Sequence, residues 1–137
     1  MSESNVEIVR SAYDAWNRGD FEAGARLFDP SIEWSTPPNL PDAGTWRGED
    51  EVRRGIGELL ESFAELRVDV RELLAADDGR VVAIVRYSGR GMDTGVAVEG
   101  AGVDAQVWTL RDGRIVRVTM YSGTADALEA VGLPARG

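Results

Sequence analysis

The sequence predicts an α+β fold in which helices from the N-terminal part of the chain wrap a curved antiparallel β-sheet. Apolar residues recur every three or four positions up to about residue 63, and from residue 66 onward polar and apolar residues alternate. Short turn signals separate the alternating stretches, which favours antiparallel pairing of consecutive strands. We expect one domain at residues 1–133 and a tail at 134–137, since 137 residues suffice for a single core.

The first stretch predicts two helices joined by a turn. Ser4 and Glu7 have the spacing of a capping box, which predicts a helix that runs to about Asn17. Asp20 is a candidate N-cap for a second helix from Phe21 to Phe28.

Asp29 and Pro30 are expected to end the second helix, and residues 31–36 to form a short strand. Residues 37–44 contain three prolines and are predicted to form a loop. A third helix is expected from about residue 48, with an acidic first turn that suits the helix dipole. Its inward side chains would be Val52, Ile56, Leu59, Leu60 and Phe63.

The remaining chain is predicted to be mostly sheet. Asp112 and Gly113 supply the backbone conformations that a tight hairpin turn requires. Gly132 and Pro134 are typical signals for the end of a helix. The expected elements are strands at 67–75 and 80–90, a loop or irregular hairpin tip at 91–102, a hairpin with arms at 103–110 and 114–121, and a helix at 125–131.

Composition excludes several kinds of chemistry. The chain has no Cys, no His and no Lys, and all fifteen basic residues are Arg. Disulfides, thiolate metal sites, thiol nucleophiles, Schiff-base lysines and imidazole bases are therefore excluded, and we expect neither a metal nor a cofactor. Acid–base chemistry would have to use Asp, Glu, Tyr, a chain terminus or water.

Charge and hydropathy exclude two classes of partner. The net charge of −9 repels phosphate backbones and anionic lipids, so we expect no nucleic-acid or membrane partner. No apolar run approaches the roughly 20 residues of a membrane span, and the N-terminal residues do not have the pattern of a secretion signal. A cytoplasmic protein is the expectation.

Several short sequence motifs, and the order in which they follow one another, resemble those of the SnoaL-like branch of the nuclear transport factor 2-like superfamily. They are AYDAWNRGD from residue 12, LFDPSIEW from residue 27, WRG from residue 46, VWTLRDGRI from residue 107, and ALEAVGL from residue 127. The resemblance, which covers nearly the whole chain, implies a cystatin-like cone with an internal pocket and a homodimer formed through the outer face of the sheet. The family includes isomerases, polyketide cyclases, epoxide hydrolases, dehydratases and non-catalytic modules, so the activity has to be argued from the site.

The residues that would line this pocket and bind a substrate are mostly aromatic. Each of these aromatic side chains has two interpretations, pocket wall or plain core, and four Trp in a chain of this length favour an aromatic cavity. The set is Tyr13, Trp16, Trp34, Thr36, Trp46, Phe63, Tyr87, Trp108 and Met120.

Three polar residues are the catalytic candidates. Asp93 stands where the resemblance to polyketide cyclases implies a His, and a simple turn also explains it. Asp104 and Gln106 share a strand face with Trp108, so Asp104 is either an acid–base group beside aromatic walls or a solvated residue at a strand end. Gln106 either orients a substrate carbonyl or water, or is a satisfied core amide.

The resemblance to ketosteroid isomerases fails at the residues that would do their chemistry. Thr36 stands where those isomerases place an Asp base, Ala12 where they place a Tyr, and Gln106 where they place an acid. An epoxide hydrolase would need an Asp bracketed by Arg, for which Asp104 and Arg86 are the candidates. We therefore expect a small cofactor-free isomerase, cyclase or hydrolase that acts on an apolar, cyclic or polyketide-like molecule. The alternative is a non-catalytic module for ligand binding or dimerisation.

Overall fold

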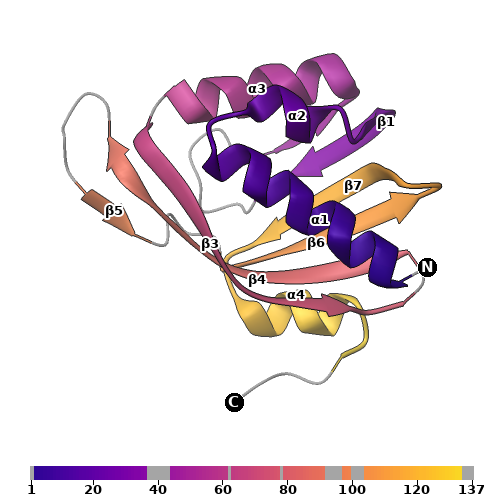
Figure 1. Ribbon diagram of the computed structural model, residues 1–137. Helices are drawn as coiled ribbons and strands as arrows, with labels where there is room; N and C mark the ends of the chain where they lie inside the picture. The colour runs from indigo at the N-terminus through magenta and orange to yellow at the C-terminus, as the bar shows by residue number, and fades with distance from the viewer. Residues whose placement is uncertain are drawn as a thin grey trace.

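Figure 1 shows the computed structural model of the chain, in which residues 2–36, 44–61, 63–77, 79–91, 97–99 and 104–133 are described. The helices are α1 (Ser2–Asn17), α2 (Phe21–Ala25), α3 (Glu49–Glu61) and α4 (Thr124–Ala130). The strands are β1 (Phe28–Ser35), β2 (Thr45–Arg47), β3 (Phe63–Ala75), β4 (Arg80–Gly91), β5 (Ala97–Glu99), β6 (Ala105–Arg111) and β7 (Arg114–Tyr121).

The strands form one curved sheet with helices on both faces. Its order is β2-β1-β7-β6-β4-β3, and β5 pairs with β4. The helices α1, α2 and α3 lie over one face, and α4 lies against the other (Figure 1). The predicted fold class is confirmed, with one parallel pair, β1 and β7, in an otherwise antiparallel sheet.

The start of the chain differs from the expectation in its boundaries. Helix α1 begins at Ser2, so Ser4 lies inside the helix and is not its N-cap. Its end is tied to the sheet, because the Asn17 amide donates to the Val68 carbonyl (2.8 Å) and accepts from the Val68 N–H (2.9 Å). Asp20 caps α2 as predicted and accepts a hydrogen bond from the Ala23 N–H at 3.2 Å.

The second predicted helix is too long. Helix α2 ends at Ala25, and Phe28, expected in the helix, begins β1 with its side chain fully buried. Asp29 and Pro30 lie inside β1, where the pairing with β7 changes register between Phe28 and Glu33. Proline is tolerated at such an irregularity because no regular ladder bond is lost there. The burial of the Phe28 side chain in the core therefore outweighs the helical periodicity of the sequence.

Phe63 was expected on the inner side of the third helix, and this was wrong. Helix α3 ends at Glu61, and Phe63 is the first residue of β3, paired with Gly91 of β4. A long β3–β4 hairpin recruits this residue because each added pair extends the ladder. Two short strands were not predicted. They are β2, which pairs with β1, and β5, which pairs with β4.

The hairpin of β6 and β7 has the predicted turn and an unpredicted bulge. Asp112 and Gly113 both have positive φ, 52° and 78°. Leu110 pairs with Ile115, but Thr109 pairs with Arg117, so β7 carries one extra residue. The bulge resets the alternation of β7, so that Ile115, Val118 and Met120 are all buried while Arg117 is exposed.

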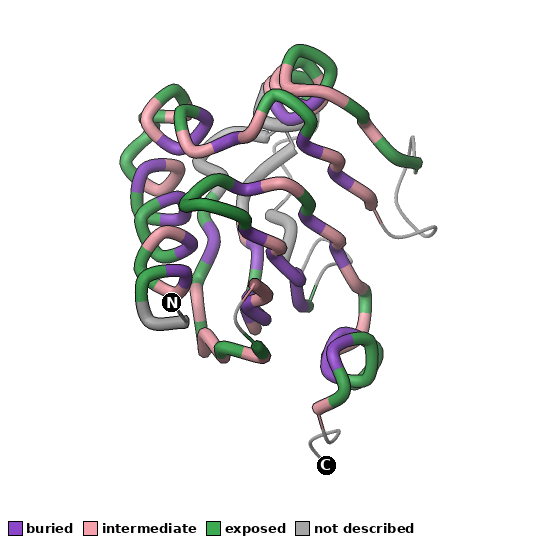
Figure 2. The backbone as a smooth tube through the Cα atoms, turned by 90° about the vertical axis from the view of Figure 1, so that its right-hand side faces the viewer, coloured by how far each residue is buried: buried purple, intermediate pink, exposed green. Residues whose placement is uncertain are grey.

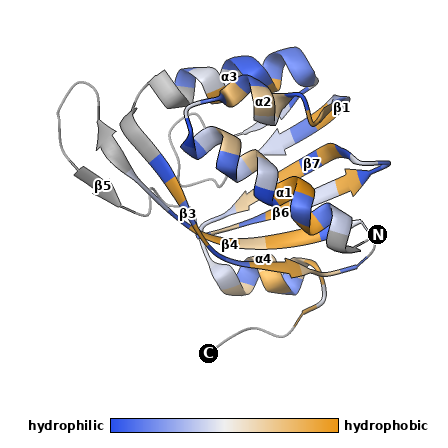
Figure 3. Ribbon diagram, viewed as in Figure 1, coloured by the Kyte–Doolittle hydropathy of each residue, from blue (hydrophilic) through white to orange (hydrophobic). Residues whose placement is uncertain are grey.

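Two apolar clusters lie on opposite faces of the sheet. The larger cluster packs α1 and α3 against the inner face, whose β4 residues are Val81, Ala83, Val85 and Tyr87. The smaller cluster packs α4 on Val82, Ala105 and Val107. Buried and more exposed residues alternate along the strands (Figure 2), and the apolar stretches of β4, β6 and β7 lie beneath α1 (Figure 3). The inner face is therefore where a site can be built.

Helix α3 offers a matched test of this packing. A Cβ added at Gly55 would lie 2.5 Å from the Trp46 ring, whereas nothing lies within 4 Å of one added at Gly57. We expect Gly55→Ala to lower the free energy of unfolding by about 1–3 kcal/mol through overpacking. Gly57→Ala should raise it by about 0.5–1 kcal/mol, because alanine costs less backbone entropy in a helix. Chemical denaturation of both variants measures the difference, and equal effects would contradict this packing of Trp46.

Candidate functional site

An aromatic cluster occupies the inner face of the sheet beneath α1. The ring centroid of Trp16 lies 5.8 Å from those of Trp34 and Trp108, and the last two are 5.7 Å apart. Tyr13 meets Trp108 edge to face at 5.2 Å. Edge-to-face and tilted contacts of this kind add to the stabilisation from burial alone.

A polar side chain, that of Gln106, lies among these apolar aromatic residues. Gln106 of β6 is completely buried, and its Oε1 accepts hydrogen bonds from the hydroxyls of Tyr13 (2.5 Å) and Tyr87 (2.8 Å). The Tyr13 oxygen in turn accepts from the Trp108 indole N–H at 2.9 Å. One helix and two strands thus meet at a single amide, and we call Tyr13, Tyr87, Gln106 and Trp108 the amide centre.

The two tyrosines of the amide centre are held in their neutral form. Burial raises the pKa of Tyr13 well above its ordinary value of 10.0, the nearby Tyr87 raises it further, and the Trp108 hydrogen bond partly lowers it. Burial also raises the pKa of Tyr87, and its hydrogen bond to Gln106 opposes that shift. The centre therefore offers neutral hydrogen-bonding groups over the whole range in which proteins usually work.

A second polar contact fixes the wall of the cluster. The Trp34 indole N–H points at the Met120 sulfur, 3.0 Å away, and both side chains are buried. A thioether is a weak acceptor, so this contact orients the indole without placing a charge in the interior.

A family model described as a SnoaL-like domain matches residues 9–118, a span that contains the amide centre. The chain belongs to the SnoaL-like domain family. An uncharacterised protein of Mycobacterium tuberculosis is 26% identical over 129 residues, which span 93% of this chain and 95% of that protein.

Solved structures agree with this assignment. Bal32a, from a soil-derived mobile gene cassette, superposes with a TM-score of 0.78 at 27% identity, over 88% of this chain and 89% of that one. An NTF2-like protein from Burkholderia thailandensis is 33% identical, with a TM-score of 0.73 over 85% of this chain and 88% of that one. The SnoaL-like fold and family are thus established, and the activity has to be argued from the amide centre.

The SnoaL-like interior brings together most of the aromatic residues named from the sequence. One buried cluster contains Tyr13, Trp34, Tyr87, Trp108 and Met120, and the partly buried Trp16 and Trp46 pack against it from α1 and β2. Thr36 lies just after β1, where its hydroxyl bonds to the Gly44 backbone at 2.9 and 3.2 Å. Phe63 starts β3, and its side chain lies outside the described part of the structure. Substrate binding by these residues stays a prediction.

The catalytic candidates have three different outcomes. Gln106 is buried at the amide centre. Asp104 is exposed immediately before β6, where its backbone pairs with Val85 and Tyr121. Asp93 lies outside the described residues. Of the three, only Gln106 is therefore placed among the aromatic walls by the described structure.

Sequence reasoning named Tyr13 and Tyr87 as aromatic walls but missed their role as partners of Gln106. The period of two on β4 places Tyr87 on the same face as Val81, Ala83 and Val85, which shows that it points inward. The 93-residue separation of Tyr13 and Gln106 leaves no local signal for their contact.

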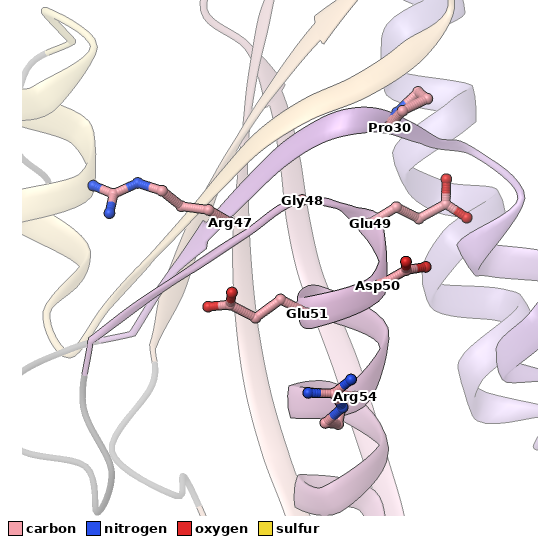
Figure 4. A pocket seen from close by; sticks show the side chains of 7 residues that line it. All are labelled: Pro30, Arg47, Gly48, Glu49, Asp50, Glu51 and Arg54. Atoms are coloured by element: carbon pink, nitrogen blue, oxygen red, sulfur yellow. The ribbon is translucent and has the colours of Figure 1, made fainter.

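A hollow lies on the surface at the start of α3, away from the amide centre (Figure 4). It encloses about 530 Å³ and is lined by Pro30, Arg47, Gly48, Glu49, Asp50, Glu51 and Arg54. Charged groups of both signs dominate it, and Arg47 extends to the side opposite Glu49 and Asp50 (Figure 4). This hollow does not suit an apolar molecule.

Within the described residues, no three Asp, Glu, His or Cys side chains gather in a way that could hold a metal ion. Within the same ranges, no helix is long and apolar enough to cross a membrane.

Removing one hydroxyl at a time tests the amide centre. Tyr13→Phe leaves the buried Trp108 N–H without its acceptor, so we expect a loss of about 1–3 kcal/mol in the free energy of unfolding. Tyr87→Phe removes one of two donors to Gln106 and should cost only about 0.5–1.5 kcal/mol. Chemical denaturation measures both, and a larger loss for Tyr87→Phe would contradict an arrangement in which Tyr13 alone serves both Trp108 and Gln106.

The raised pKa values predict that the two buried tyrosines keep their protons in alkali for as long as the protein stays folded. In a Tyr121→Phe variant only Tyr13 and Tyr87 remain, so the folded protein should show no tyrosinate absorbance as the pH passes 10.0, the ordinary tyrosine pKa. Unfolded tyrosines lose their protons there while folded ones keep them, so stability should fall as the pH rises above that value. Tyrosinate absorbance that rises while circular dichroism still reports a folded protein would contradict the burial of both phenols.

Proposed function

We propose that this SnoaL-like protein is a small cofactor-independent enzyme, of isomerase, cyclase or hydrolase type. It would take a mainly apolar, cyclic or polyketide-like molecule into the aromatic interior and convert it by carboxylate acid–base chemistry. One observation carries the proposal: a buried amide, held by two neutral phenols, lies within a wall of Trp rings. A well-packed core has no need of such a group, because a buried polar side chain costs stability unless it is fully hydrogen-bonded.

The aromatic wall supplies affinity and the amide supplies orientation. Trp16, Trp34 and Trp108 offer broad apolar faces for a ring-shaped molecule. Gln106 would fix an oxygen of that molecule, and a fixed oxygen determines which carbon faces the catalytic group.

The proton-transfer groups in this proposal are Asp104 and Asp93. Asp104 precedes Gln106 by two residues, so the two belong to the same face of the strand, roughly 7 Å apart along it. A molecule held at Gln106 and extending toward the beginning of β6 would approach the Asp104 carboxylate at the exposed end. Asp93 is proposed on the resemblance to polyketide cyclases alone.

Molecules recovered from the purified protein test the proposal. We expect such a molecule to be changed by fresh protein, either in mass or by uptake of deuterium from heavy water. Asp104→Asn or Asp93→Asn should lower the rate 100-fold or more, roughly the contribution of one general base. Asp69→Asn, an exposed carboxylate on β3, is the matched control. Unchanged rates in both Asp104→Asn and Asp93→Asn would exclude these carboxylates.

The second candidate function is binding without chemistry. It is favoured by the lack of charged side chains among the buried residues of the described ranges. The buried polar residues there are Asn5 and Gln106, and both are neutral. A molecule that returns unaltered, with no deuterium uptake, would establish binding instead of catalysis.

Pairing of two chains through the outer face of the sheet remains a prediction from the family resemblance. Helix α4 covers part of that face, and Ile84 and Tyr121 beside it are half-buried in the single chain.

A further inference from the structure

The amide centre has more hydrogen-bond donors than acceptors. Among the described residues, the buried side-chain polar atoms without a partner are Trp16 Nε1 and Gln106 Nε2, and both are donors. Trp16 Nε1 lies against α2, only 2.6 Å from where a Cβ of Gly24 would be, so it belongs to the contact between the two helices. Gln106 Nε2 is therefore the unpaired group of the amide centre.

The proton count shows why the amide nitrogen, and not the oxygen, is left unpaired. The Tyr13 oxygen already accepts from Trp108, so its own proton needs an acceptor, and so does the proton of Tyr87. Gln106 Oε1 serves both. Turning the amide over would leave both phenol protons and the amide oxygen without partners. The observed orientation leaves only the N–H groups of Nε2 unsatisfied.

The surroundings also determine which charge an occupant can carry. The buried polar residues of the described chain are two neutral amides, and no arginine is among them. An anion taken into this interior would lose its hydration without gaining a cation, which is costly. A neutral acceptor meets no such penalty. Two phenols that donate to Oε1 also polarise the amide and strengthen its N–H groups as donors.

We infer that the interior selects a neutral molecule that presents a hydrogen-bond acceptor, such as a ketone or ester carbonyl, to Gln106 Nε2. The inference rests on the proposed function for the existence of a small-molecule site, and it adds the polarity of the group recognised there. A molecule with only donors, or with a carboxylate at that point, would be rejected.

Three simple aromatic probes of similar size test this selection. Acetophenone carries the neutral acceptor, ethylbenzene carries none, and benzoate carries a charged one. Their dissociation constants are measured at neutral pH by quenching of tryptophan fluorescence, for the native protein and for Gln106→Met. Methionine keeps the length of the side chain and a weak acceptor for the phenols, as Met120 provides for Trp34, and it removes both N–H groups.

The comparison uses the ratio of the acetophenone and ethylbenzene affinities in the native protein and in Gln106→Met. The difference in hydrophobicity between the probes affects both ratios equally and cancels when the two ratios are compared. The preference for acetophenone over ethylbenzene should fall roughly threefold to tenfold in Gln106→Met, which corresponds to the loss of one net hydrogen bond. Asn5→Leu removes the other buried amide as a matched control and should leave the ratio unchanged. Benzoate should bind the native protein more weakly than acetophenone.

A direct measurement on the native protein is also available, because Gln106 is the only glutamine in the chain. Labelling glutamine with ¹⁵N in its side-chain amide therefore gives one pair of N–H proton signals. Acetophenone should move this pair to lower field, and ethylbenzene should not. This readout does not depend on whether the Gln106→Met variant folds.

Several results would overturn the inference. They are an affinity ratio unchanged in Gln106→Met, an amide signal that does not respond to acetophenone, tighter binding of benzoate, and a native protein that binds no acetophenone. An amide met only by an ordered water would give the second of these. Selection of acetophenone together with normal turnover in the Asp104 and Asp93 variants would sustain the inference while the proposed carboxylate chemistry fails.

Discussion

The hydroxyl of Tyr13 is the contact on which the interior of this protein depends. It accepts from Trp108 and donates to Gln106, and it therefore joins α1 to β6 at two points through one atom. Tyr87 adds β4 to the same centre. Three elements far apart in the sequence are thus held in one register by neutral hydrogen bonds in an apolar surround, where such bonds are stronger than in water.

The bulge in β7 is the second constraint, because it determines what faces the amide centre. Without the extra residue, the period of two that begins at Ile115 would turn Arg117 inward and Val118 outward. With it, Met120 comes to lie opposite Gln106 and accepts the Trp34 N–H, while Arg117 reaches the surface and pairs with Glu33 at 3.1 Å. Among the described residues, this irregularity keeps the charge of Arg117 out of the interior.

A neutral interior changes which chemistry suits the site. The two phenols stay protonated because burial raises their pKa values, so they can donate hydrogen bonds but cannot act as bases at neutral pH. Of the two carboxylates proposed for proton transfer, Asp104 is exposed immediately before β6. In the proposed function, binding at Gln106 and proton transfer at Asp104 would thus be separated along one strand, an arrangement that also suits a protein that binds without chemistry.

The sequence alone determined the α+β class and the Asp112–Gly113 turn, because these depend on local periodicity and turn chemistry. It also determined the family and most of the aromatic cluster, through motifs whose order and spacing resemble those of SnoaL-like proteins. It misplaced Phe28 and Phe63, since both have helical spacing but gain more from burial or pairing in a strand. Only the tertiary structure decided that Gln106 meets Tyr13 and Tyr87, and that Asp104 is exposed at the strand end. Such contacts join residues distant in the chain, and a one-residue bulge is enough to move them to the other face of the sheet.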